Sequence, residues 1–378
     1  MNFDFTEEQS MLRDSVARYV QDSYDFETRR TIADSQAGMS AQQWQTFAEL
    51  GWLSVPFAEE YGGFGGGPVD TMLLMEEFGK GLVLEPYLAT VLLFGALLQR
   101  GGNQALADEY LPKIIEGSCQ GAFAYLERQS RFELRDVKTR ASNDGEGYRL
   151  NGEKVVVFNG ANADALIVSA RTAGEQADAE GISLFLVPAS AAGVVVTPFK
   201  QMDGQTVANI TLDNVAVPAT ALIGEAGGAL ALIEPVVQSA VVALAAEALG
   251  IMAQLNAKTL EYTKTRKQFG VAIGSFQALQ HRMVDTFMAY EQTKSLLYRA
   301  VCELEEGADS AATTAHALKA MVDRAGKLIY GEAIQLHGGM GLTDELDIGH
   351  YAKRLMMINA TFGNGDYHQG RFDALRYA

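Results

Sequence analysis

Cysteine is nearly absent from this sequence, because its 378 residues include only Cys119 and Cys302. Two cysteines cannot form a disulfide framework, so the composition favours a reducing compartment and predicts a cytoplasmic location. The five histidines and the two cysteines fall at no zinc-ligand spacing, and no His-Glu-x-x-His string occurs. The sequence therefore predicts no metal site.

Positive charge is scarce as well. The chain has 30 Lys and Arg residues against 47 Asp and Glu residues, which gives a net charge of −17. A protein of this charge is not attracted to nucleic acid or to anionic lipid, so neither is predicted as a partner. A small anionic ligand would need a local group of arginines, lysines or helix N-termini.

Long uninterrupted apolar runs are also missing. The most apolar stretch, residues 229–253, is broken by Glu234, Pro235, Gln238 and Glu247. This pattern predicts a buried helix and no membrane span. The first eight residues are acidic and lack an apolar core, so they do not resemble a signal peptide.

The pattern of the sequence changes twice along the chain. Residues 1–120 carry helical periodicity, residues 121–227 carry short β-rich runs between turn residues, and residues 228–378 carry long helical runs. We therefore predict an α+β protein with an N-terminal α-helical domain, a central antiparallel β domain and a C-terminal four-helix bundle. Asn143-Asp144-Gly145 and Asn151-Gly152 are typical hairpin turns of a barrel or sandwich.

The most distinctive string is Arg266-Lys267-Gln268-Phe269-Gly270, followed by Phe276 and Gln277. Arginine offers a planar fork to phosphate oxygens, phenylalanine a stacking face, and glutamine an amide for a ring edge. The same residues would also form an ordinary loop, in which Gly270 ends a helix and Arg266 lies near its C-terminus. Residue chemistry alone leaves both interpretations open.

A second glycine-containing string, Gln335-Leu336-His337-Gly338-Gly339-Met340-Gly341, follows another predicted helix. Glycines let a backbone approach a pyrophosphate closely, although a glycine cap and turn is their commoner use. The glycine-rich segment 61–67 lacks both a preceding strand and a Gly-Lys-Ser/Thr ending. It predicts a connection between helices and not a phosphate-binding loop.

Four groups of residues together resemble the acyl-CoA dehydrogenases over nearly the whole chain. They are residues 50–63 (LGW followed by PFAEEYGG), residues 150–160 (LNGEK followed by NG), residues 266–277 and residues 335–341. The resemblance implies the acyl-CoA dehydrogenase fold, FAD as cofactor and an acyl-CoA substrate. It also implies α,β-desaturation, in which a glutamate removes the α-proton, hydride passes to flavin N5, and an electron-transfer flavoprotein accepts the electrons.

The resemblance also assigns residues to FAD binding. They are Leu126, Phe158, Arg266, Gln268, Phe269, Gln277, Gln335, Gly338 and Gly339. In the family the two bundle motifs contact FAD across a subunit interface, which implies an oligomer. Leu126 and Phe158 stand where the family usually has threonines, so the hydroxyl contacts to the flavin are lost.

The usual catalytic glutamate is missing. The family's Tyr-Glu-Gly-Thr aligns with Phe362-Gly363-Asn364-Gly365, which puts glycine at the position of the base. Some family members carry the base on the first long bundle helix, where this chain has Glu247. Its helix neighbours are apolar or small, and a carboxylate desolvated there suits proton abstraction near neutral pH. A structural glutamate at a helix contact is the alternative, and Asp366 and His368 are further candidates.

Leu84-Glu85-Pro86-Tyr87 and residues 246–250 look most like the small subunits of pimeloyl-CoA and steroid side-chain acyl-CoA dehydrogenases. Those subunits often form heterotetramers in which two chain types share FAD sites. We expect an acyl-CoA dehydrogenase of β-oxidation, in fatty acid or steroid catabolism, with Glu247 as base. It would be a homo-oligomer or a heterotetramer with a second such subunit. The alternatives are a non-catalytic subunit that completes a partner's FAD site, and a flavin oxidase or monooxygenase of the same fold.

Overall fold

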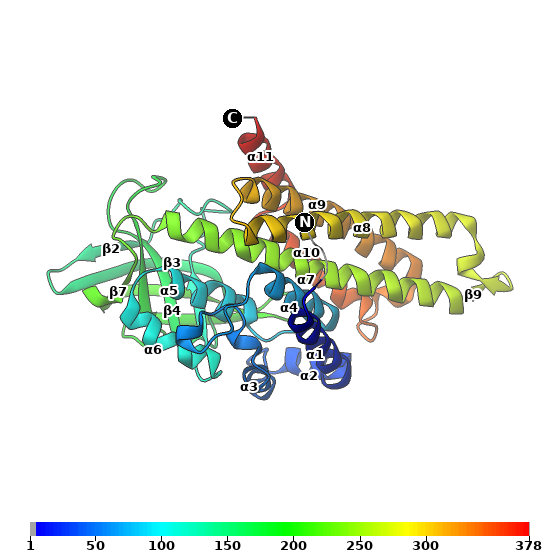
Figure 1. Ribbon diagram of the computed structural model, residues 1–378, viewed down its shortest axis with the longest axis horizontal. Helices are drawn as coiled ribbons and strands as arrows, with labels where there is room; N and C mark the ends of the chain where they lie inside the picture. The colour runs from blue at the N-terminus through cyan, green and yellow to red at the C-terminus, as the bar shows by residue number, and fades with distance from the viewer. Residues whose placement is uncertain (1–4, 378) are drawn as a thin grey trace. The chain divides into compact units, whose positions relative to one another are not determined.

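The computed structural model describes residues 5–377, which fold into two compact units. Unit 1 comprises residues 5–31, 67–83 and 241–377, and unit 2 comprises residues 32–66 and 84–240. Figure 1 follows the chain in colour through both units. The first eight residues do not resemble a signal peptide in sequence, and residues 1–4 of them lie outside the described residues.

The chain changes from helices to strands, and back to helices, at the positions that the sequence predicted. The last N-terminal helix ends at Ile115 and the first strand begins at Gly121, while the strand ending at Ile223 is followed by a helix from Leu230. The order of α, β and α regions is therefore confirmed. The division into domains 1–120, 121–227 and 228–378 stays a prediction, because the N-terminal helices are distributed between the two compact units.

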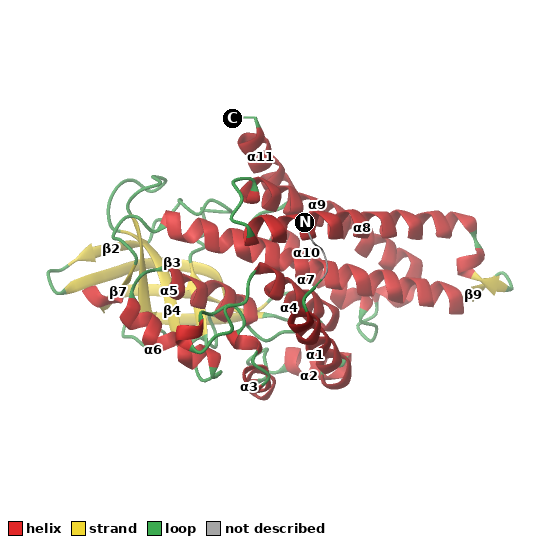
Figure 2. Cartoon of the chain, viewed as in Figure 1, coloured by secondary structure: helices red, strands yellow, loops and turns green. Residues whose placement is uncertain are grey.

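Unit 2 is built on one eight-stranded sheet, drawn in yellow in Figure 2. Most neighbouring strands are antiparallel, but β1 and β2 both run parallel to β4. The predicted antiparallel domain is therefore a mostly antiparallel sheet. In spatial order the strands are β6 (Val194–Lys200), β7 (Thr206–Pro218), β3 (Gly147–Phe158), β2 (Arg140–Asn143), β4 (Ala165–Arg171), β5 (Ile182–Pro188) and β8 (Leu222–Ile223), with β1 (Gly121–Ala124) beside β4.

The two predicted hairpin turns have different outcomes. Asn143-Asp144-Gly145 does connect β2 to β3, and the Asp144 amide donates to the Gly147 carbonyl at 3.1 Å. The prediction of a turn at Asn151-Gly152 is wrong, because both residues lie inside β3. The register there shifts between Leu150 and Gly152 against β7, and Gly152 has a φ of +157°. Glycine at this position allows the backbone conformation that the β-bulge requires.

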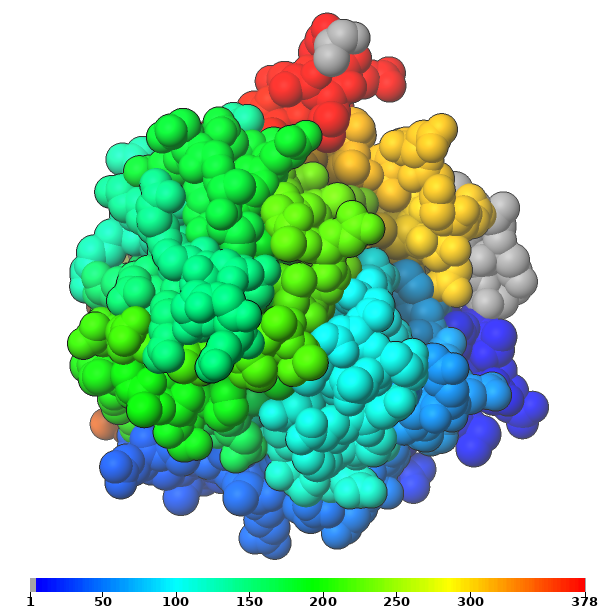
Figure 3. All heavy atoms as spheres, turned by 90° about the vertical axis from the view of Figure 1, so that its left-hand side faces the viewer, coloured from blue at the N-terminus to red at the C-terminus, as the bar shows by residue number. Residues whose placement is uncertain are grey.

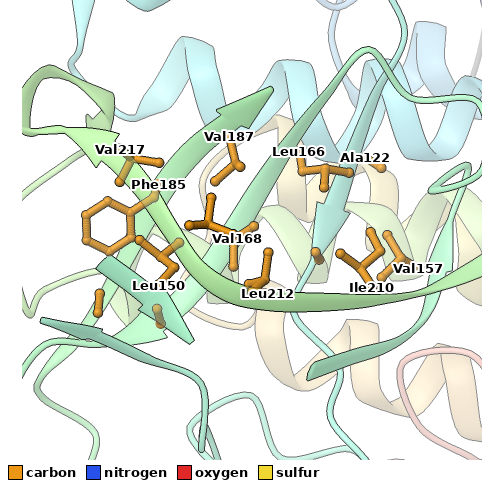
Figure 4. Packing of buried hydrophobic residues seen from close by; sticks show 14 of the residues in the cluster. Ala122, Leu150, Val157, Leu166, Val168, Phe185, Val187, Ile210, Leu212 and Val217 are labelled. Atoms are coloured by element: carbon orange, nitrogen blue, oxygen red, sulfur yellow. The ribbon is translucent and has the colours of Figure 1, made fainter. Parts of the chain in front are cut away.

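The core of unit 2 consists of apolar side chains from β1, β3, β4, β5 and β7 that point to one side of the sheet, as Figure 4 shows. Leu150, Leu166, Val168, Phe185 and Ile210 are all fully buried there. Strand β4 is buried at every position and β5 at all but its last residue, so these two strands are covered on both faces.

Short helices pack beside this sheet. The α-helices are α3 (Ala41–Glu49), α5 (Ala96–Arg100) and α6 (Gln104–Ile115); the others are η1 (Trp52–Ser54), η2 (Glu59–Tyr61), η4 (Ala219–Ala221) and a π-helix, η3 (Leu88–Gly95). Asn103, which caps α6, donates from Nδ2 to the carbonyls of Thr220 and Leu222 at 3.0 and 2.7 Å. These contacts tie the cyan α6 segment to the light green segment formed by η4 and the start of β8, and Figure 3 shows that face.

Unit 1 contains the long helices. They are α7 (Leu230–Thr265, of which residues 241–265 belong to this unit), α8 (Gln277–Glu305), α9 (Ala311–His337) and α10 (Ile348–Ala360), and they lie where the sequence carries long helical runs. The predicted C-terminal helical domain is confirmed. Helices α1 (Glu7–Ser23), α4 (Pro68–Gly81) and α11 (Gly365–Arg376) complete the unit, while α2 (Phe26–Asp34) crosses the division.

One described helix, α7, is long and apolar enough to cross a membrane by length and composition alone. Of its most apolar 18-residue window, 83% is buried inside the protein. A helix covered in this way has the character of a core helix, as the interrupting polar residues predicted.

Candidate active site and cofactor-binding residues

Glu247 lies in the middle of α7, where α4 crosses it at very short range. A Cβ added to Gly79 would collide with the Glu247 carbonyl, and one added to Gly250 would collide with the Glu76 carbonyl. Small residues are therefore required at this crossing. The Glu247 side chain is only 6% exposed, so the burial that its apolar neighbours indicated is present.

The carboxylate of Glu247 is bound by Arg354 of α10. Oε1 lies 2.5 Å from Arg354 Nε and Oε2 lies 2.8 Å from Arg354 Nη2, and the arginine side chain is only 7% exposed. Both oxygens thus accept a charge-assisted hydrogen bond from one guanidinium. Each oxygen keeps a second lone pair, so a base role for Glu247 would depend on a substrate reaching a side chain that is largely covered.

Gly363 lies in the loop between α10 and α11, with a φ of +124°. Lys319, fully buried on α9, donates from Nζ to the carbonyls of Gly363 at 2.7 Å and Asn359 at 3.2 Å. A Cβ added to Gly363 would collide with Tyr367 and with the imidazole of His368. The loop thus lacks a carboxylate, and a buried imidazole occupies the space beside it.

His368 is held as a neutral imidazole with both ring nitrogens engaged. Nε2 lies 3.1 Å from the Phe362 carbonyl, so it carries the proton, and Nδ1 lies 2.8 Å from His316 Nδ1, from which it accepts. Burial and then the positive charge of Lys319 lower the pKa of His368 to about 3, and burial lowers the pKa of His316 to about 4. His368 therefore has no lone pair to offer a substrate. Asp366, the other candidate, is exposed in the first turn of α11.

The Arg266 motif forms an exposed hairpin between α7 and α8, at the end of that helix pair in Figure 1. Strands β9 (Lys267–Gln268) and β10 (Val271–Ala272) pair around Phe269, which has a φ of +54° and is 92% exposed. A phenyl ring in that position indicates a surface that a ligand or another chain covers. No side-chain bond of Arg266 is found among residues 5–377, so its guanidinium can bind an anion.

The glycine-containing motif lies beside this hairpin. His337, the last residue of α9, stacks on Tyr262 with ring centroids 4.3 Å apart, and Tyr262 precedes Arg266 by one helical turn. Gly338 has a φ of +60°, and nothing within 4 Å would meet a Cβ added to Gly338 or Gly339. The fold therefore brings the arginine motif and an open glycine turn together. Cationic and backbone donors in this arrangement suit a pyrophosphate, as FAD requires.

Leu126 and Phe158 belong to unit 2, where β1 and β3 come together. The Val155 amide donates to the Leu126 carbonyl at 2.8 Å, so the segment after β1 is fixed to β3. Val156 has a φ of +52°, which is a rare conformation for a β-branched residue. Such strain tends to occur at ligand sites, and these segments carry Leu126 and Phe158, which the resemblance assigns to FAD binding.

A fully buried ion pair joins the segment after β1 to β3. Lys154 donates from Nζ to Glu127 Oε1 at 2.7 Å and to Ser169 Oγ at 3.0 Å. The Glu127 carboxylate also accepts from the amides of Lys138 and Thr139 at 2.7 and 3.0 Å. Burial would raise the pKa of Glu127, but Lys154 and these donors hold it at about 2, so the carboxylate stays charged.

Sequence reasoning missed Arg354 and Lys319, although a signal for each was present. Arg354 belongs to the apolar face that Tyr351, Leu355 and Ile358 define on α10, and all of these residues are buried. A cation on such a face needs a buried acceptor, so Arg354 could have been paired with Glu247. Lys319 lies beside the buried Leu318 in the same way, but no spacing rule predicts that its partners are backbone carbonyls.

Known proteins resemble this chain over almost its full length. The family models named "Acyl-CoA dehydrogenase, N-terminal domain", "middle domain" and "C-terminal domain" match residues 6–118, 122–215 and 233–371. "Probable acyl-CoA dehydrogenase YngJ" of Bacillus subtilis (strain 168) is 30% identical over 353 residues, 92% of each chain.

Two solved structures show the same fold. PigA with FAD and proline is 27% identical with a TM-score of 0.93, over 100% of this chain and 99% of that one. One chain of the ChsE4-ChsE5 complex from Mycobacterium tuberculosis is 25% identical with a TM-score of 0.90, over 100% and 99%.

Proposed function

This chain belongs to the acyl-CoA dehydrogenase family, and we propose that it works as one subunit of a heteromeric dehydrogenase, in which a homologous partner supplies the proton-abstracting carboxylate. Membership makes it a flavoprotein oxidoreductase with FAD as its cofactor, acting on acyl-CoA-like substrates. Bound FAD supplies the hydride acceptor. The chain's own role would be to hold FAD and to shape the thioester site.

The main support for this proposal comes from Glu247 and Gly363, the two positions at which a member of the family could carry the base. Both oxygens of Glu247 are bound by Arg354, and Gly363 has no side chain. A general base must direct a lone pair at the proton that it removes, and the buried, ion-paired Glu247 gives a substrate little access to the lone pairs that Arg354 leaves. The ChsE4-ChsE5 structure, a complex of two chain types, supports a heteromeric arrangement by similarity.

The residues that would hold FAD fall into two groups. Arg266 and the turn at Gly338 and Gly339 would bind the pyrophosphate, while Gln268, Gln277 and Gln335 offer amides and Phe269 a stacking face. Leu126 and Phe158 would pack against the flavin ring. An electron-transfer flavoprotein as acceptor, a cytoplasmic location, and a role in fatty acid or steroid catabolism complete the proposal.

A second candidate function is an enzyme that uses Glu247 itself as base. It is favoured by one observation, the burial of this carboxylate among apolar residues of α7. Desolvation of that kind suits proton abstraction once a carboxylate is released from its partner. In this case the thioester would have to reach a lone pair of Glu247 that Arg354 leaves unused.

The visible spectrum of the purified protein distinguishes the two candidates. We expect little bound FAD when the chain is produced alone. Coexpression with an acyl-CoA dehydrogenase chain of the same genome that has glutamate at the position of Gly363 should give a yellow complex, which an acyl-CoA bleaches. A chain that purifies alone, saturated with FAD and bleached by an acyl-CoA, would contradict the heteromeric proposal.

A further inference from the structure

Lys154 is a fully buried lysine on β3, the strand that also carries Phe158. Its ammonium donates to Glu127 Oε1 at 2.7 Å, to Ser169 Oγ at 3.0 Å and to the Tyr125 carbonyl at 3.3 Å. Each of its three protons therefore has an acceptor. Apolar side chains that replace a buried ion pair often keep a protein equally stable, so stability alone does not explain why this pair is present.

The same lysine acts on the peptide group that joins Tyr125 to Leu126. The carbonyl of this peptide accepts from Lys154, and the next carbonyl, that of Leu126, accepts from the Val155 amide at 2.8 Å. Among residues 5–377 the Leu126 amide donates to no acceptor. An ammonium at the carbonyl polarises the peptide and makes its N–H a stronger donor. The half-buried Leu126 thus presents a fixed, polarised donor that fits a cofactor atom.

Both members of the ion pair are charged at neutral pH. Burial would raise the pKa of Glu127, yet Lys154 and the neighbouring donors hold it at about 2. Burial lowers the pKa of Lys154 to about 8, although Glu127 opposes the shift, so the ammonium stays protonated at pH 7. The two charges therefore cancel. Glu127 directly follows Leu126 in the chain, so the loss of Lys154 would leave a full negative charge beside the segment assigned to FAD.

Reduction changes the charge of FAD. Two electrons and one proton enter the ring system, which adds one negative charge to the cofactor. A buried negative charge nearby disfavours the reduced form more than the oxidised form, because a protein interior screens the repulsion poorly. An ion pair that is neutral as a whole does not impose this penalty on the reduced form.

We propose that Lys154 sets the reduction potential of the FAD held by this chain, because it cancels the charge of Glu127 and polarises the peptide of Leu126. Lys154 reaches FAD only through these two neighbours, so it is a positioning residue and not a catalytic one. The inference rests on the proposed function for the placement of FAD beside Leu126. It adds which buried group keeps that cofactor easy to reduce.

The reduction potential of bound FAD tests this inference, measured against an indicator dye in the absence of acyl-CoA. The sample is the FAD-containing form of the protein, either the chain alone or the coexpressed complex. We expect Lys154→Met to bind reduced FAD about tenfold more weakly relative to oxidised FAD, which lowers the potential by about 30 mV for a two-electron couple. Lys138→Met is the matched control. It removes the same charge from an exposed side chain of the same segment and should leave the potential unchanged.

The double variant Lys154→Met/Glu127→Gln separates charge from structure. It removes both charges, and the new amide oxygen can still accept from the amides of Lys138 and Thr139. We expect it to recover most of the tenfold loss, whereas damage to the fold would not be repaired by a second change in the core. Lys154→Gln replaces Lys154→Met if the latter does not fold, because its amide can still donate to the Tyr125 carbonyl.

Three results would overturn the inference. They are a potential in Lys154→Met equal to that of wild type, an equal fall in Lys138→Met, and a double variant with the potential of the single one. Flavin bleaching by an acyl-CoA is recorded on the same samples and tests the proposed function separately. A complex that bleaches while its potential does not depend on Lys154 would refute this inference alone. A Lys154-dependent potential in a chain that purifies alone, saturated with FAD and bleached, would refute the heteromeric proposal alone.

Discussion

Each unit contains a buried glutamate that is paired with a cation, and the two pairs differ in how much of the fold satisfies the carboxylate. In unit 2, Glu127 accepts from Lys154, from two backbone amides and from Gln129. In unit 1, the Glu247 carboxylate accepts hydrogen bonds from Arg354 alone among residues 5–377. The first pair belongs to a network that holds a loop to a strand, whereas the second joins two helices through one residue.

This difference predicts in which unit the loss of the cation lowers the free energy of unfolding less. A buried carboxylate with backbone donors keeps part of its stabilisation when its cation is lost, because those donors are fixed by the chain. A carboxylate that depends on one guanidinium becomes an uncompensated buried charge. Removal of the cation should therefore affect unit 1 more than unit 2.

The largest effect is expected for Arg354→Met. This change leaves Glu247 buried without its partner, and such changes destabilise proteins by about 3–5 kcal/mol. Denaturant unfolding with helix content as the signal measures it. Lys353→Met is the matched control, since the neighbouring lysine lies at the surface near Asp344 and should change stability by less than about 1 kcal/mol. If Arg354→Met lowered the free energy of unfolding no more than Lys353→Met does, the predicted difference between the two units would be wrong.

A smaller effect is expected for Lys154→Met. The Glu127 carboxylate keeps the Lys138 and Thr139 amides, so the loss of its charged partner should cost about 2–3 kcal/mol. Lys138→Met is the control, because the exposed Lys138 contributes its amide and not its side chain to Glu127. If Lys154→Met lowered the free energy of unfolding more than Arg354→Met does, the backbone amides would not stabilise the Glu127 carboxylate as proposed.

The smallest effect is expected from moderate acid, and it should again appear in unit 1 first. His316 and His368 have pKa values of about 4 and about 3 in the folded protein, below the usual value near 6.5. The unfolded state therefore binds more protons below pH 6.5, and stability falls as the pH falls toward 4, by about 1–2 kcal/mol between pH 7 and pH 6 for the two histidines together. The carboxylate of Glu127, with a pKa of about 2, loses its stabilisation only below about pH 4.5.

Two optical signals distinguish the loss of stability caused by the histidine pair from the loss caused by Glu127. Trp44 and Trp52 both lie in unit 2, so their fluorescence reports that unit, while circular dichroism follows the helices. Helix signal should weaken at a higher pH than tryptophan fluorescence changes, and His316→Gln should reduce the early loss. Simultaneous loss of both signals near pH 4 would show that the histidine pair contributes nothing.

Periodicity in the sequence was enough to predict the long helices and most strands, because burial of apolar faces determines them. It failed where tertiary contact decides the conformation. Helix α11 and the short strand β2 were not predicted, since α11 carries few apolar residues and β2 has only one buried residue. Asn151-Gly152 has the composition of a turn, but pairing with β7 on both sides makes it a bulge.

The candidate site could be predicted only in part. Local strings located Arg266, Gly338 and the absent base at Gly363, because each motif is continuous in sequence. The partners that decide their chemistry come from distant segments. Arg354 follows Glu247 by 107 residues, and the contact of His316 with His368 spans 52. The buried Thr206 hydroxyl packs against the loop at Gly38, a contact that no local pattern indicates.

The central claim is that Glu247 is a structural partner of Arg354 and does not remove a proton. The direct measurement is the rate of flavin reduction by an acyl-CoA in the coexpressed complex, comparing wild type with Glu247→Gln/Arg354→Gln. This double change replaces an ion pair with two amides that can bond to each other. We predict retained FAD and a rate within about threefold of wild type, whereas a loss of about a hundredfold or more with FAD still bound would contradict the claim.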